Sequence, residues 1–287
     1  MKKRIAVAVA IAVLLAASAC AQTTDFFELV KAGTPQQVQA AIDKGANTKA
    51  QDAMGRTPLM VAALDNPNPE VIMTLLRAGA DINAHDGMGE NCLVFGSRNK
   101  LEVITTLLQA GADIESRDAG YDGNALMWAA KYTKDPKVIS TLLRAGSDIN
   151  SRNSDGLTAL IWAATSNINV EVILTLIKAG GDVNAQDSSS QTALMWAAKS
   201  DPNPEVITAL LNAGSNIEAR DSLGRTPLLH AAATNPNPEV IITLLKTGAD
   251  AKAKDSAGKA AFDYANSNYG LRAKGTDALK QLEEASK

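Results

Sequence analysis

Apolar residues recur along most of the chain in short clusters whose spacing is that of helices. Between residues 57 and 76 the apolar positions fall on one side of each of two short helices, which are separated by a polar and proline-rich stretch. Such helices are stable only when their apolar sides are buried against neighbours. In this unit the expected core positions are Leu59, Ala62, Ala63, Val71, Leu75 and Leu76.

The same pattern occurs six times at a nearly constant period. The first element reads TPLMVAA, NCLVFGS, NALMWAA, TALIWAA, TALMWAA and TPLLHAA, at starting points 33 or 34 residues apart: Thr57, Asn91, Asn124, Thr158, Thr192 and Thr226. A second element keeps the same phase, as in EVIMTLLRAGADINA from Glu70. A fixed period of this length indicates a repeat protein, in which each unit packs against the next.

The ends of the expected helices carry residues that start and stop helices. The Thr or Asn that opens each first element suits an N-cap, and Pro58 suits the N1 position that follows it. A glycine such as Gly79 follows each second element, where a left-handed residue ends a helix at least cost. Between the two elements, the prolines of runs such as Asn-Pro-Asn-Pro at 66–69 end one helix and begin the next.

Taken together, these features resemble the ankyrin-repeat family, in which T-P-L-H-x-A opens the first of two antiparallel helices. The resemblance covers nearly all of the chain beyond its N-terminal segment, although Asn-Pro-Asn-Pro replaces the family's commoner Gly-His turn. It implies an all-α solenoid of stacked helix-turn-helix units joined by β-hairpin loops. Residues 22–287 would form one ankyrin-repeat domain, with an N-cap repeat at 25–51, repeats at 52–85, 86–117, 118–152, 153–186, 187–220 and 221–254, and a C-cap repeat at 255–287.

Residues 1–21 have the pattern of a secretory signal peptide. A basic start at residues 2–4 precedes an apolar run at 5–17, which is shorter than the roughly 20 residues needed to span a bilayer. Cleavage before Gln22 would release a soluble product, whereas a loose lipobox would make Cys20 the acylated first residue. We favour cleavage before Gln22 because Ala17 stands where a lipobox usually has Leu. We therefore expect an exported protein, periplasmic or secreted, or else lipid-anchored at the cell envelope through Cys20, its only link to a membrane.

Composition and charge narrow the class of partner. Hydrophobic residues make up 46% of the chain and charged residues 21%, which suits a folded soluble body. Without the three basic residues of the leader, 25 basic residues face 31 acidic ones, a formal charge of −6. An acidic balance of this kind argues against a nucleic-acid partner.

No group of residues has the spacing that catalysis or metal binding requires. His85 and His230 lack a second His or Cys at ligand spacing, and Cys92 lies inside a repeat motif without a histidine partner. Neither G-x-S-x-G nor H-E-x-x-H occurs. We therefore expect no catalytic residue, no metal and no cofactor. An enzyme with a site near the C-terminal cap, within 266–276, is the alternative.

The fifth position of the first helix varies between repeats and is the main candidate for recognition. It reads Val61, Phe95, Trp128, Trp162, Trp196 and His230, and in the ankyrin family it tends to line the concave side. The rings could seal the contact between repeats, or they could form a binding surface, where Trp and Tyr are enriched. The predicted partner-binding residues are Phe95, Tyr121, Trp128, Lys131, Tyr132, Trp162, Trp196, Lys199 and His230.

The function predicted from sequence is that of a non-catalytic protein-protein interaction module in the bacterial cell envelope. We expect a monomer that binds a protein on its concave face, and the fold does not name that protein. The alternative is an inhibitor or protective protein for a specific envelope enzyme or toxin.

Overall fold

The computed structural model describes residues 25–98, 100–166, 169–200, 203–268 and 276–287. It divides into two compact units, Met1–Gly120 and Tyr121–Lys287. The division falls beside Tyr121, where the loop before the first helix of the third repeat has one residue more than the loops of its neighbours. The expected signal peptide and Cys20 lie outside the described residues.

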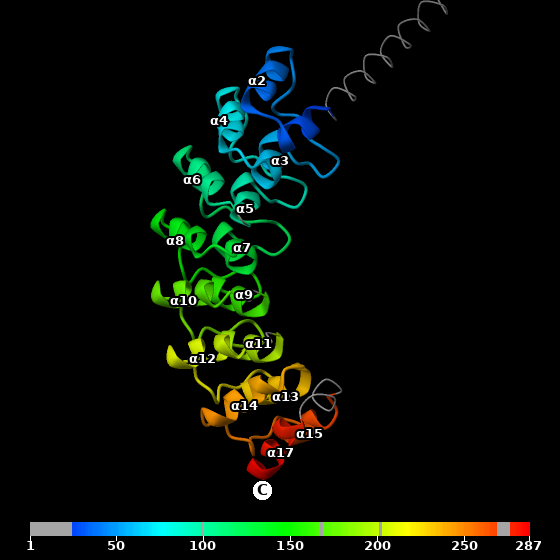
Figure 1. Cartoon of the computed structure of the whole chain (residues 1–287), viewed down its shortest axis with the longest axis vertical. Coiled ribbons are helices and arrows are strands. Elements are labelled where there is room, and N and C mark those ends of the chain that lie inside the picture. The colour runs from blue at the N-terminus through cyan, green and yellow to red at the C-terminus, as the bar shows by residue number, and fades with distance from the viewer. Residues whose placement is uncertain (1–24, 99, 167–168, 201–202, 269–275) are drawn as a thin grey trace, which may run out of the picture. The chain divides into compact units, whose positions relative to one another are not determined.

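The first unit is a stack of short helix pairs (Figure 1). Residues 25–32 are helical, and α3 packs against α5 while α4 packs against both α2 and α6. First helices and second helices therefore form separate layers. The bounds are α2 (Pro35–Asp43), α3 (Pro58–Asp65), α4 (Pro69–Arg77), α5 (Cys92–Ser97) and α6 (Leu101–Gln109).

The second unit repeats this arrangement. Its first helices pack side by side in chain order, and its second helices form the other layer (Figure 1). The first helices are α7 (Ala125–Tyr132), α9 (Ala159–Ser166), α11 (Ala193–Ser200), α13 (Pro227–Thr234) and α15 (Ala261–Ala265). The second helices are α8 (Pro136–Arg144), α10 (Val170–Lys178), α12 (Pro204–Asn212), α14 (Pro238–Lys246) and α17 (Thr276–Ala285).

The all-α class predicted from the sequence is confirmed, and the loops between repeats are tight turns. In one such loop the Asp187 N–H donates to the Gln191 carbonyl at 2.9 Å. Within the described residues no strand forms, and the isolated bridge between Gln186 and Thr192 is the only pairing of this kind. The segments on either side of each turn are too short to pair as β-strands.

The helix boundaries follow the predicted cap residues. Thr57 and Thr226 accept N–H groups from the third residue of α3 and α13, and Asn91 and Asn124 do the same for α5 and α7. Gly79 has a φ of +83°, a left-handed conformation that a residue with a Cβ adopts only at a cost. The caps predicted at these positions are therefore confirmed.

The core lies between the two helix layers and between successive repeats. In α3 every residue from Pro58 to Ala63 is buried, so a first helix is covered on all sides. In α4 the buried apolar residues are Val71, Ile72 and Leu75. The prediction was wrong for Leu76, which is only half-buried. The face of α4 that packs inward carries Val71, Ile72 and Leu75, and Leu76 lies at its edge.

Buried asparagines join neighbouring repeats at the turns between helices. Asn235 is fully buried, and its Nδ2 donates to the Ala198 carbonyl of the previous repeat at 2.9 Å, while its Oδ1 accepts the Asn237 N–H at 2.8 Å. Asn66 reaches back in the same way to the Val30 carbonyl at 2.9 Å. The first Asn of Asn-Pro-Asn-Pro therefore links repeats, a role that the sequence analysis did not assign.

Candidate functional site

Five of the predicted partner-binding residues form one aromatic cluster in the second unit, comprising Tyr121, Trp128, Lys131, Tyr132 and Trp162. The Trp128 ring stacks on Tyr132 at a centroid distance of 5.7 Å and meets Trp162 edge-on at 5.1 Å. Tyr121 lies edge-on to both tryptophans, at 5.8 and 6.1 Å. Contacts of this kind contribute about 0.5–1.5 kcal/mol each beyond the area that they bury.

The tryptophans form the floor of the aromatic cluster and the tyrosines its surface. Trp128 and Trp162 are only 5% and 4% exposed, whereas Tyr121 is 51% exposed and Tyr132 is 45% exposed. The sealing role considered for the tryptophans therefore describes their burial, and the rings of the cluster that a partner could contact are those of the two tyrosines. Tyr121 owes its position to the extra residue in its loop, where Asp122 adopts a φ of +53°.

Lys131 lies at the centre of the aromatic cluster. Its Nζ is 5.2 Å from the Trp162 centroid and 5.3 Å from that of Tyr132, and it lies within 6 Å of the other two rings. The negative faces of aromatic rings attract a cation at such distances. Within the described residues the Lys131 ammonium has no hydrogen bond and no ion pair, and the four aromatic rings are its recorded contacts.

Two repeats further on, Trp196 and Lys199 form a simpler pair. The Lys199 Nζ lies 4.7 Å from the Trp196 centroid, and both side chains are half-buried. The Trp196 indole N–H donates to Asp187 Oδ2 at 2.8 Å. The structure therefore places a lysine over a tryptophan at two points of the same helix layer.

A carboxylate nine residues earlier holds the ring at the fifth position in several repeats. Asp187 accepts from Trp196, Asp221 pairs with His230 at 2.9 Å, and Asp255 accepts the Tyr264 hydroxyl. In each case Oδ1 of the same Asp accepts two backbone N–H groups of its loop. This link was missed from the sequence, although the constant spacing of nine could have indicated it.

Asn153 breaks this rule at the aromatic cluster. Its Oδ1 accepts the usual two N–H groups, from Asp155 and Leu157, but an amide nitrogen replaces the second carboxylate oxygen. That nitrogen donates to the Tyr121 carbonyl at 2.8 Å. The Trp162 indole N–H consequently has no acceptor within the described residues, although it is buried. A buried donor without an acceptor costs about 1–3 kcal/mol of stability. The hydrogen bond from Asn153 to the Tyr121 carbonyl in turn anchors the loop that carries Tyr121.

His230 lies in a buried polar group, apart from the aromatic cluster. Burial, reinforced by the positive charge of Arg225, lowers the pKa of His230 to about 4, although Asp221 acts in the opposite direction. Burial alone would raise the pKa of Asp221, but hydrogen bonds from Arg225 and Leu223 hold it below its ordinary value. At neutral pH His230 is therefore uncharged and donates through Nε2. With 2% of its surface exposed, it contributes packing and a hydrogen bond to the repeat.

Phe95 belongs to the first unit, where Arg98 covers it. The Arg98 Cζ is 5.2 Å from the Phe95 centroid, and its guanidinium pairs with Glu90. Burial raises the pKa of Glu90, with Arg98 opposing the shift. Phe95 is 4% exposed, so the accessible part of this group is the arginine.

Further observations concern the Cys92 thiol and possible metal ligands among the described residues. Cys92 is buried, its thiol donates to the Ile82 carbonyl, and burial raises its pKa to about 12, so the thiolate is suppressed. The described part of the chain holds no cluster of three or more His, Cys, Asp or Glu that could bind a metal. None of the helices described there has the length and apolar character needed to cross a bilayer.

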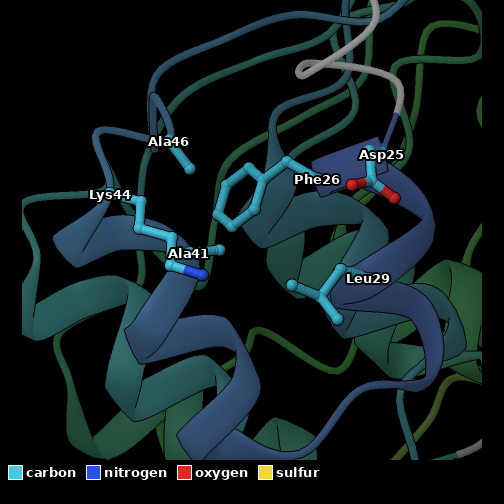
Figure 2. Close-up of a pocket in the computed structure, with 6 residues that line it drawn as sticks. All are labelled: Asp25, Phe26, Leu29, Ala41, Lys44 and Ala46. Carbon is cyan, nitrogen blue, oxygen red and sulfur yellow. The ribbon is translucent and has the colours of Figure 1, made fainter.

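A small hollow of about 200 Å³ lies at the N-terminal end of the first unit. Figure 2 shows the Phe26 ring beside Ala41 and Ala46, with Leu29 on the other side and the charged Lys44 at the rim. Ligand pockets usually measure about 300–1,000 Å³ and hold several convergent polar groups. The hollow is therefore a packing gap of the cap repeat and does not compete with the aromatic cluster.

Comparison with known families settles what kind of repeat this is. The family model "Ankyrin repeats (3 copies)" matches residues 26–118, 126–221 and 171–255. The chain belongs to the ankyrin-repeat proteins. No curated protein matches the chain. Ankyrin repeats are protein-protein interaction modules and are generally non-catalytic, so the ankyrin-repeat surface described above is best judged as a surface for binding proteins.

Proposed function

We propose that this ankyrin-repeat chain is an exported protein of the bacterial envelope that binds a protein partner through the exposed last turns of its first helices. This surface, called the first-helix face, comprises residues 131–132, 165, 199–200 and 233–234, together with Tyr121 of the loop before α7, whose ring lies beside Lys131. The observation that carries the proposal is the exposure of Tyr121 and Tyr132 around the unpaired Lys131. Exposed aromatic side chains over a rigid floor are typical of binding hot spots.

Export is supported by the leader pattern of residues 1–21. After export the chain would be soluble in the periplasm or medium, or attached through lipid on Cys20. The mass of the N-terminal peptide distinguishes these products, because a chain that begins at Gln22 carries no lipid and one that begins at Cys20 carries acyl groups. Retention of the leader in the native host would contradict export.

Photo-crosslinking in the native host tests the binding face. Benzoylphenylalanine in place of Tyr132 should give a discrete adduct with one protein, because this position is exposed on the first-helix face. The same group in place of Lys178, exposed at the end of α10 in the second-helix layer, is the matched control and should give none. No adduct from either position, or the same adduct from both, would overturn the proposed face.

A further inference from the structure

The first-helix face of the second unit carries an unusual balance of charge. Helices α7, α9, α11 and α13 read ALMWAAKY, ALIWAATS, ALMWAAKS and PLLHAAAT, and they contain no Asp or Glu. Their charged side chains are Lys131 and Lys199, and His230 is neutral at pH 7 because of its lowered pKa. In a chain that is acidic overall, these four helices are therefore locally basic.

Three carboxylates of the loops that precede the first helices are already engaged. Asp187 accepts from Trp196, Asp221 pairs with Arg225 and His230, and Asp255 accepts from Tyr264. Within the described residues neither lysine has an ion pair, and each ammonium lies over an aromatic ring. A cation held over rings keeps its donors available to an incoming anion, because a ring face accepts no strong hydrogen bond.

The aromatic cluster also supplies an apolar contact beside the charge. Tyr121 and Tyr132 are both about half exposed, and the Lys131 Nζ lies 5.9 and 5.3 Å from their centroids. An acidic side chain that reaches Lys131 would therefore bring the next apolar side chain of its own segment against a tyrosine ring.

We infer that the partner presents an extended acidic segment, in which one carboxylate binds Lys131, an adjacent apolar side chain packs on Tyr121 or Tyr132, and a second carboxylate binds Lys199. This inference rests on the proposed function and specifies the chemistry of its partner. Packed helices lie about 8–10 Å apart, so two repeats separate the lysines by about 16–20 Å. An extended chain rises about 3.3 Å per residue, which places the two carboxylates about five or six residues apart.

A displayed peptide library tests this chemistry without knowledge of the partner. The probe is a library of random twelve-residue peptides on phage, selected on the immobilised chain from residue 22 onward. Twelve extended residues span about 40 Å, enough to reach both lysines. Recovered peptides should carry two Asp or Glu about five or six positions apart, with an apolar residue beside one of them, and their binding should weaken as salt concentration rises.

Matched variants separate the binding of carboxylate from a general loss of charge. Lys131→Gln should reduce the recovery of these peptides about tenfold or more, a change that corresponds to one charge-assisted contact. Lys131→Arg should retain recovery because it keeps the cation over the rings, and Lys178→Gln should retain it because that lysine lies in the other layer. Melting temperatures identify any variant that fails to fold. If Lys131→Gln is such a variant, Lys199→Gln provides the second measurement and should reduce the recovery of the peptides by a smaller factor.

Several results would overturn the inference. These are a neutral or basic consensus, equal recovery on Lys131→Gln, or no recovery above the uncoated surface. Binding of a twelve-nucleotide thymidine strand with no acidic peptide recovered would assign the lysines to nucleic acid. A protein adduct at position 132 together with a non-acidic consensus would leave the proposed function standing and contradict only the partner chemistry. Absence of both would contradict the two proposals together.

Discussion

At the scale of single residues, Asn153 stands where other repeats have an aspartate, and this difference changes which hydrogen bonds its loop can make. Asp187 and Asp221 use their second carboxylate oxygen to accept from the ring nine residues later. Asn153 has a nitrogen there, donates to the Tyr121 carbonyl, and leaves the Trp162 N–H buried without an acceptor. The Trp162 N–H therefore lacks a stabilising hydrogen bond, while the loop that carries Tyr121 gains one.

Asn153→Asp should reverse this exchange. The new oxygen would accept the Trp162 N–H and face the Tyr121 carbonyl, so one hydrogen bond forms and one is lost. The free energy of unfolding should stay within about 2 kcal/mol of wild type, since each such bond contributes about 1–2 kcal/mol. In a ¹H–¹⁵N spectrum, the Trp162 indole peak should move toward the position of Trp196, whose own peak should stay in place. An unmoved Trp162 peak would show that Asn153 does not set this pattern.

His230 should give the protein a pH-dependent stability that one substitution removes. Because its pKa falls to about 4 in the folded protein, from 6.5, the unfolded chain binds a proton first as pH decreases. Stability should therefore be complete above pH 6.5 and fall by about 3 kcal/mol between pH 6.5 and 4 from this group alone. Measurement by urea denaturation at several pH values gives the slope.

The matched variant is His230→Phe, because Phe95 already occupies the equivalent position, nine residues after Asp86. Asp221 keeps its pair with Arg225 in this variant, at 2.8 Å. The difference in unfolding free energy between wild type and variant should change across pH 4–6.5 and be constant above it. A difference that is flat across the whole range would mean that His230 titrates normally.

At the scale of elements, the links between repeats depend on the asparagines of the turns. Asn235→Ala should lower the free energy of unfolding by about 2–4 kcal/mol, because it leaves the Ala198 carbonyl and the Asn237 N–H without these partners in a buried site. Asn212→Ala, exposed at the end of α12, should change stability by less than about 0.5 kcal/mol. Equal effects of the two substitutions would contradict the linking role. Thermal or denaturant unfolding provides the comparison.

The helices and their caps could be predicted from sequence because they depend on local chemistry. Thr57, Asn91 and Gly79 act on backbone groups within one turn, so residue type and spacing are sufficient. The role of Asn66 could not be read in this way, since its partner Val30 lies 36 residues earlier and is a backbone carbonyl. Leu76 was misplaced because the buried face of a nine-residue helix shifts with small changes in how it packs.

At the scale of the whole molecule, the repeat period predicted both the family and the layer from which the aromatic residues project. It brought Tyr121, Trp128, Lys131, Tyr132 and Trp162 into one predicted surface, and the structure places these five together. The period could not show which side chains remain exposed, because neighbouring repeats bury Trp128 and Trp162 almost completely. The accessible rings of the cluster are Tyr121, in the loop with the extra residue, and Tyr132, at the end of α7.

In the proposed function, Tyr121 and the rest of the aromatic cluster bind the partner protein. The most direct test uses the partner protein that is identified by crosslinking at position 132. Once this partner is purified, its dissociation constant is measured with the wild-type chain and with the variants Tyr121→Ser and Leu223→Ser. Leu223 is the control because it is an exposed apolar loop residue, at 54%, outside the aromatic cluster. Tyr121→Ser should weaken binding about tenfold or more, the change of a hot-spot residue, while Leu223→Ser stays within about twofold. Loss of the ring contacts of Tyr121 should lower the melting temperature of Tyr121→Ser, so binding is measured at a temperature at which all three proteins are folded. Equal affinities for all three proteins would contradict the account.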